Sequence, residues 1–355
     1  MAQFASAQTL PLVQSSFALV RKTSPIGFDF WFTPDSKARI QEVPLQDHAD
    51  IVYTAHLLGA ADALRAQAAA EFHTLLATAK LYGRPNGQAL VENGPNAHLT
   101  AYLLGAARLL QAADKGVMPA ALFQGWELSQ LISAQHLPLW PRAWTHHIWR
   151  VSHWIGGIPS ILLQIAESGC NPQITRDVVD RVLQSASEKI IDPRTGLLRP
   201  YKSEFLQKLF RSAYRLRHNP EIGDLGGVVH LLWVFHATGR TYIGDAALFD
   251  NARKQLQAEP FMEKAPYCLD FDIVQLARTC KAAESEARSA LVDRATRFRK
   301  DIAEFLTGEI PGGYTLHKLP GALATMHESA IIEGLAQVPE VGIAPVDIIR
   351  DAFWI

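Results

Sequence analysis

The chain has 355 residues, of which 48% are hydrophobic and 19% charged, so it is long enough to bury a substantial core. Its 34 Lys and Arg residues balance 35 Asp and Glu residues, and the net charge of −1 gives no general attraction for nucleic acid. The three cysteines have neither disulfide-framework nor metal-ligand spacing, which favours a reducing compartment. We expect a soluble globular protein without nucleic acid, metal or cofactor.

The amino-terminal segment and the hydropathy pattern argue against export and membrane insertion. The first twenty residues lack a basic region followed by a continuous apolar one, and no stretch reaches eighteen consecutive apolar residues. We therefore expect a cytoplasmic protein with no membrane association.

Helical periodicity dominates the chain and regular β alternation is almost absent, which predicts an all-α fold. The region 1–47 has no helical period and is expected to pack on the rest as an extension, while 48–355 forms a single domain. The expected helices, in chain order, are 48–73, 96–113, 119–134, 142–168, 174–190, 204–216, 226–238, 244–257, 270–283, 288–307 and 321–336.

The expected helices are of two kinds, and they form a repeat. Segment 226–239 is apolar nearly all round, as in a buried helix, whereas 174–190 carries a single apolar stripe. Glycines recur thirteen residues apart, in the pairs Gly156 and Gly169, Gly226 and Gly239, and Gly321 and Gly334. We expect the first glycine of each pair where a loop enters a buried helix, and the second at a left-handed C-cap.

Helical hairpins of this kind either stack as a solenoid or close into an (α/α) toroid. Their unequal lengths and long connections favour the toroid, with short turns at one rim before the inner helices. In a toroid the ends of the inner helices surround a cavity, so polar residues at the starts of those helices are the candidates for function.

The first candidates flank the glycine pair at 226–227. Asp224 precedes it and is either a general acid or base, with its pKa raised by apolar surroundings, or the N-cap of the helix. His230 follows about one turn into the helix, as a catalytic group or as a core histidine.

A second group surrounds the turn IDPRTGLLRP at 191–200. Asp192 is either catalytic or a turn residue. Downstream, 194–217 holds seven Lys and Arg residues against one Glu, which suits an anionic group such as a uronate but also a solvated helix face. Tyr201 and Lys202 are the candidate substrate-binding residues here.

The third candidate pair is Asp270 and Asp272, at the expected start of a helix. Residues at i and i+2 do not share a helix face, so one is expected to cap the helix while the other faces the cavity. No third ligand follows at a suitable spacing for a metal.

Two further positions complete the candidate site. Segment 146–154 places Arg150, His153 and Trp154 together, which suits a sugar ring, although Trp at helical spacing also suits a core. Glu328 lies two turns into the last inner helix, where a buried carboxylate is either paired with a cation or functional.

The repeated hairpins, the buried helices that open with Gly, and the DPRTGLL turn at Asp192–Leu198 resemble the six-hairpin (α/α) toroid glycosidase superfamily, and within it the unsaturated uronyl hydrolases. The resemblance implies that Asp224 or Asp192 is the general acid and base. It also implies that Arg150, Trp154, Tyr201 and Lys202 hold the sugar.

The leading hypothesis is therefore a carbohydrate-active enzyme, a glycoside hydrolase or unsaturated-uronate hydrolase, acting on an oligosaccharide or another small molecule that can be anionic. The alternative is a noncatalytic helical toroid that binds a glycan or a protein partner. A terpenoid-type cyclase comes third, because the DFDI at 270–273 falls short of the DxDD signature and no DDxxD is present.

Overall fold

The computed structural model of the chain describes residues 10–23, 44–79, 81–82, 94–111, 120–123, 148–198, 205, 220–257, 259–280 and 285–355. Within these ranges the regular structure is helical, and the β pairing is confined to two isolated bridges, Ile191 with Leu198 and Val338 with Ile343. The all-α prediction is confirmed for this part of the chain.

The described helices fall close to most of the expected segments. They are α2 (Pro11–Thr23), α4 (Leu45–Leu57), α5 (Ala61–Thr78), α6 (Gly94–Leu109), the 3₁₀ turn η4 (Ala120–Phe123), α8 (Ile148–Ser168), α9 (Arg176–Lys189), α11 (Pro220–Thr238), α12 (Asp245–Gln255), α13 (Cys268–Thr279), α14 (Ser285–Thr307), α15 (Lys318–Glu333) and α16 (Ile348–Ala352). The expected helix at 204–216, apart from residue 205, and most of that at 119–134 lie outside the described residues.

Three expectations about helix positions are wrong. Segment 48–73 is not one helix, because Gly59 adopts φ +73° and separates α4 from α5. The region 1–47 is not without helical structure, since it contains α2 and the start of α4. Finally, α11 begins at Pro220, six residues before the expected start at 226, so Asp224 lies inside the helix and is not its N-cap. Proline suits such a first turn because its missing N–H would have no partner there.

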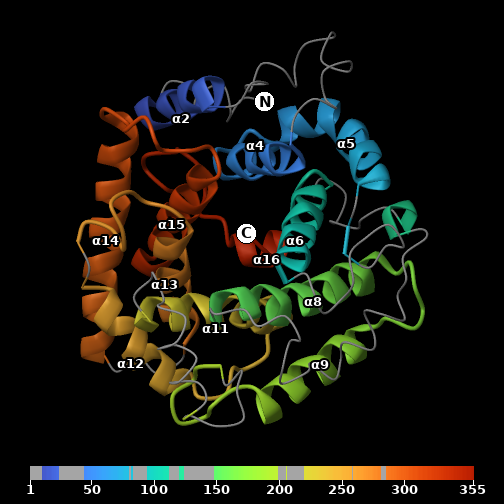
Figure 1. Ribbon diagram of the computed structural model, residues 1–355. Coiled ribbons are helices and arrows are strands. Elements are labelled where there is room, and N and C mark those ends of the chain that lie inside the picture. Colours follow the sequence, from blue (N-terminus) through green and yellow to red (C-terminus); the bar gives the residue numbers. More distant parts are fainter. Residues whose placement is uncertain are drawn as a thin grey trace.

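Six of the described helices pack in a closed series, and we call them the inner helices (Figure 1). Each contacts the next, from α4 to α6, α8, α11, α13 and α15, and α15 returns to α4. Outside them, α5 packs on α4, α9 on α8, α12 on α13 and α14 on α15, while α2 packs on α14. The distinction between the two kinds of helix holds for α9, which buries one stripe that includes Val179 and Leu183, and for α11, which is buried from Leu225 to Phe235.

Glycine residues allow neighbouring inner helices to approach one another closely. Gly156 and Gly321 lie inside α8 and α15, not at their starts as expected. A Cβ on Gly156 would lie 2.5 Å from the carbonyl oxygen of His230 in α11, and one on Gly321 would lie 2.5 Å from the backbone nitrogen of Cys268 in α13. These glycines therefore allow the backbones of neighbouring helices to touch.

The second glycine of each pair does end its helix as expected. Gly169, Gly239 and Gly334 have φ values of +63°, +72° and +72°, in the left-handed region that favours glycine. The predicted left-handed C-caps are confirmed at all three positions.

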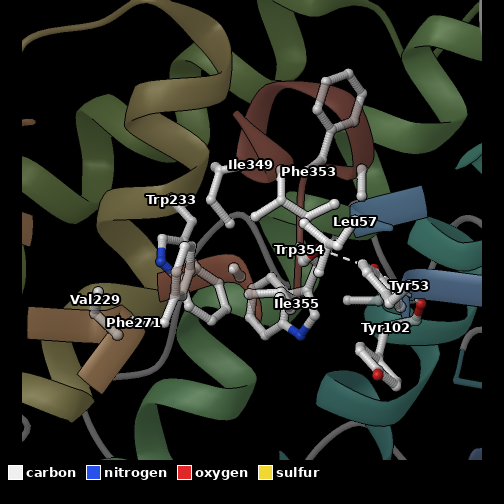
Figure 2. Packing of buried hydrophobic residues seen from close by; sticks show 14 of the residues in the cluster. Tyr53, Leu57, Tyr102, Val229, Trp233, Phe271, Ile349, Phe353, Trp354 and Ile355 are labelled. Carbon is white, nitrogen blue, oxygen red and sulfur yellow. Dashed lines mark hydrogen bonds between the residues drawn. The ribbon is translucent and has the colours of Figure 1, made fainter. Parts of the chain in front are cut away.

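The short helix α16 and residues 353–355 lie in the space surrounded by the inner helices (Figure 1). Side chains of α4, α6 and α8 donate to four consecutive carbonyl oxygens of this segment: Arg108 to Asp351 (2.8 Å), Gln164 to Ala352 (2.7 Å), Ser160 to Phe353 (3.1 Å) and Tyr53 to Trp354 (2.8 Å). Figure 2 shows Trp354 and Ile355 packed among Trp233, Phe271 and the tyrosines of α4 and α6. Because these backbone acceptors are satisfied, residues 352–355 can remain buried at the centre of the molecule.

Candidate functional site

A cavity of about 160 Å³ lies between the inner helices, near the N-terminal ends of α6, α13 and α15. Its wall is formed by His98 and Tyr102 of α6, His230 and Trp233 of α11, Cys268 and Asp272 of α13, His317, Pro320 and Gly321 of α15 and its start, and Ile355. This volume is close to the ~150 Å³ of an engineered cavity that binds benzene. The cavity therefore accommodates one small ring or the end of a larger molecule.

Asp272 is the carboxyl group among the described residues of the cavity wall. The residue is only 1% exposed, and its Oδ1 atom has no hydrogen-bond partner in the described part of the chain. Burial, followed by the nearby charge of Asp270, raises the pKa of Asp272 well above its ordinary value. This shift favours the protonated form of Asp272, which is the form that can donate a proton.

Asp270 has a different function from its neighbour. Its two carboxylate oxygens accept from the backbone N–H groups of Met262 (2.8 Å) and Tyr267 (3.0 Å), and the second bond is part of a capping box at the start of α13. Burial raises the pKa of Asp270 to about 6 although both hydrogen bonds oppose the shift. The prediction that one aspartate caps the helix while the other faces the cavity is confirmed.

A second carboxylate lies directly behind the wall. Asp50 of α4 is fully buried, and its Oδ1 accepts from the Tyr102 hydroxyl at 2.6 Å and from Nδ1 of His317 at 2.9 Å. Partial burial opposes protonation of His317, but the hydrogen bond to Asp50 and the charge of that carboxylate outweigh it and raise the pKa of the imidazole. Burial and Asp50 raise the pKa of Tyr102 well above its ordinary value, so its hydroxyl remains a donor.

His98 and His230, two more histidines of the cavity wall, contact each other, and both contact Trp354. The indole N–H of Trp354 donates to Nδ1 of His98 at 3.1 Å, so the remaining proton of a neutral His98 is on Nε2. His230 stacks on Trp354 and contacts His98 and Trp233 edge to face. Burial and the neighbouring His98 lower the pKa of His230 well below its ordinary value, so it is neutral.

The other candidates from the sequence are distributed as follows. Asp192 lies in the turn after α9, where Oδ1 accepts from the backbone N–H of Arg194 at 3.0 Å, and it is not part of the cavity wall. Glu328 is paired with Arg278, which agrees with the cation pairing considered above. His230 lies in the cavity wall and is 3% exposed, a position that is compatible with both interpretations given above.

The remaining candidates fall on residues whose side chains are not described. Arg150, His153 and Trp154 belong to α8 and Asp224 to α11, but only their helical backbone is described. Tyr201, Lys202 and most of the basic stretch 194–217 lie outside the described residues.

Several residues of the site have no counterpart in the sequence-based predictions. Asp50 opens a mostly apolar stretch of α4, DIVYTAHL, and a carboxylate at such a position could have been singled out from the sequence. His317 follows the rim turn GGYTL directly, at the N-cap of α15. Their pairing spans 267 positions in the chain, so no local pattern could have joined them.

Comparison with known proteins finds no match for the chain among protein-family models, curated proteins or solved structures. None of the helices in the described ranges is both long and apolar enough to cross a membrane. Among the described side chains, no three His, Cys, Asp or Glu residues are grouped so that they could hold a metal ion.

Proposed function

We propose that the chain is a glycoside hydrolase with an (α/α) toroid fold, and that Asp272 is the proton donor to the leaving oxygen. The observation that carries the proposal is the buried carboxyl group of Asp272 in the wall of a cavity, whose Oδ1 atom has no hydrogen-bond partner among the described residues and whose pKa is raised. Glycoside hydrolysis requires a carboxyl group of this kind, because the glycosidic oxygen must be protonated as its bond to carbon breaks.

The arrangement of the helices supports the toroid. Six inner helices form a closed series of contacts, and the outer helices pack against them. The cavity lies near the starts of three inner helices, which is the position expected for a site in such a fold. The hairpin pattern of the sequence and its resemblance to the six-hairpin glycosidases agree with this assignment.

The charge of the cavity favours a neutral sugar over a uronate. No Lys or Arg is among the described residues of the wall. The buried carboxylate of Asp50 lies behind the wall, where it disfavours a ligand that carries a negative charge. Trp233 and Tyr102 supply aromatic faces of the kind that pack on sugar rings. The small volume suits one terminal sugar unit at a time.

A noncatalytic toroid that binds a glycan or a protein is the second candidate. The observation in its favour is that α16 and residues 353–355 fill the centre, which leaves only a small cavity. The cyclase hypothesis receives less support, because about 160 Å³ is well below the roughly 300 Å³ at which pockets for larger ligands begin.

A hydrolysis screen distinguishes the candidates. Purified wild-type protein and the variants Asp272→Asn, Asp224→Asn and Asp250→Asn are incubated with neutral and unsaturated uronate-bearing oligosaccharides, and released sugar is measured. Asp250 is an exposed surface carboxylate, so its variant is the matched control for the change from carboxyl to amide. Circular dichroism and thermal melting show whether each protein is folded.

We expect release of a neutral sugar by the wild type and by Asp250→Asn, and a loss of at least ~100-fold in Asp272→Asn. Full activity in a folded Asp272→Asn protein would refute the assignment of the proton donor, and loss in Asp224→Asn alone would return that role to Asp224. A folded wild-type protein that hydrolyses none of the glycans would favour the binding toroid.

A further inference from the structure

The contact between α4 and the start of α15 builds a second proton-transfer group at the cavity. Nδ1 of His317 is 2.9 Å from Oδ1 of Asp50, and the same oxygen accepts from the Tyr102 hydroxyl at 2.6 Å. Asp50 is completely buried, whereas the His317 side chain is 49% exposed and lines the cavity. The carboxylate is thus fixed inside the protein, and the imidazole it holds reaches the site.

The two nitrogens of this imidazole differ because of that bond. A carboxylate accepts, so Nδ1 of His317 carries a proton and donates it to Asp50. Nε2 is then the nitrogen that can take up or release a proton at the cavity. A buried carboxylate behind a histidine sets its tautomer and stabilises the imidazolium that forms when Nε2 is protonated.

We propose that His317 is the general base that activates the attacking water, with Asp50 and Tyr102 as its positioning residues. The inference rests on the proposed function and extends it, because Asp272 alone supplies a proton and does not remove one. Tyr102 donates to Asp50 and so shares the carboxylate with His317, which moderates the basicity of the imidazole.

The step balances in atoms and charge. Asp272 gives its proton to the glycosidic oxygen while the bond from that oxygen to the anomeric carbon breaks. A water oxygen bonds to the same carbon, and the proton that the water loses goes to Nε2 of His317. The products are a hydroxyl on each fragment, an Asp272 carboxylate and a His317 imidazolium. Proton exchange with solvent then restores both groups.

The groups that face His317 come from several elements. Asp47 and Asp50 of α4 both favour the imidazolium, and the Tyr102 ring of α6 packs edge to face at 5.8 Å. Cys268 and Asp272 of α13 share the cavity with it. Because Asp50 makes the direct hydrogen bond, its removal is expected to have the largest effect on the titration.

The first test is a substrate-free titration, which separates this inference from the proposed function. Protein labelled at histidine is titrated by NMR, and the His317 signals are identified by their absence in His317→Gln. We expect the titration midpoint of His317 to fall by about one pH unit in Asp50→Asn. In Tyr102→Phe we expect the titration midpoint of His317 to rise, because Oδ1 of Asp50 then accepts a hydrogen bond from His317 alone. Unchanged midpoints in both variants would overturn the inference even in an active enzyme.

The second test uses the sugar that the wild type releases. General bases contribute factors of about 100 or more, so His317→Gln is expected to lower kcat at least ~100-fold with little change in KM. It should also abolish the acidic limb of the pH profile. His56→Gln is the matched control, because His56 also pairs with an aspartate, Asp351, at 3.0 Å but is not in the cavity wall. Full kcat and an intact acidic limb in His317→Gln would overturn the role of His317 and leave that of Asp272 standing.

Discussion

Replacement of Gly156 by alanine tests whether the inner helices depend on backbone contact. Gly156 lies in the interior of α8, and an added Cβ would be 2.5 Å from the carbonyl oxygen of His230 and 2.6 Å from its carbonyl carbon. Both atoms belong to the backbone of α11, a helix that also contacts α13 and α16. The clash therefore cannot be relieved by a side-chain rotation, and one helix must move.

Two effects oppose one another in this variant. Alanine is favoured over glycine in a helix interior by about 1 kcal/mol. Overpacking of a well-packed core costs about 1–3 kcal/mol, and the upper part of this range applies because backbone atoms are in contact. We expect the clash to win and the free energy of unfolding to fall by about 1–2 kcal/mol.

Urea unfolding followed by circular dichroism measures this difference. Gly312→Ala is the matched control, because a Cβ there has no atom within 4 Å, and its stability should stay within about 0.5 kcal/mol of the wild type. A Gly156→Ala protein as stable as the wild type, or more stable, would show that helix propensity outweighs the contact. The close approach of α8 and α11 would then not be required for the stability of the protein.

Three further changes test the interior. Burial lowers the pKa of His327 to about 4, so the neutral imidazole contributes about 3 kcal/mol of stability, which is complete above pH ~6.5 and is lost as the pH falls toward 4. In urea unfolding, His327→Gln should therefore remove the fall in stability between pH ~6.5 and 4. An unchanged pH dependence would contradict a low pKa for His327. Glu328→Gln should cost about 3 kcal/mol in the same assay, since it removes a buried partner of Arg278, and a neutral result would show that the ion pair is dispensable. Trp354→Phe should cost about 1 kcal/mol and change the ¹⁵N shifts of His98, whose tautomer is set by the lost N–H; unaltered shifts would exclude that hydrogen bond.

Local chemistry was predictable wherever short-range geometry determines it. Asp270 and Asp272 could be separated by function because two positions along a helix cannot share a face. The glycine C-caps followed from conformational preference, as at Gly169 and Gly334. The cost of burying a lone charge reduced Glu328 to two alternatives, a cation pair or a functional group, but it could not name Arg278 as the partner.

Positions that depend on contacts between distant segments were not predictable in the same way. Gly156 was expected at the start of a helix, but its role is set by His230 of another helix. The hydrophobic periodicity of 48–73 continues through Gly59 because α4 and α5 both pack on the same core. The sequence pattern therefore predicted one helix, and only the positive φ angle of Gly59 marks the boundary between the two. The pair of Asp50 and His317 joins the first inner helix to the last, so it exists only once the series of helices has closed.

The segment 346–355 connects the cavity to a partly buried ionic network near the C-terminal ends of α11 and α13. Asp347, the N-cap of α16, accepts from His236 at 2.8 Å and from Arg278 at 2.9 Å. Burial alone would raise the pKa of Asp347, but these bonds and the charge of Arg278 outweigh it and lower the pKa well below its ordinary value. The same segment ends in Trp354, which holds two histidines of the cavity. The ion pairs of Asp347 thus hold the start of α16, and α16 in turn positions Trp354 against the two histidines. Removal of an ion pair should therefore shift His98 and His230 through the backbone of the six residues between Asp347 and Trp354.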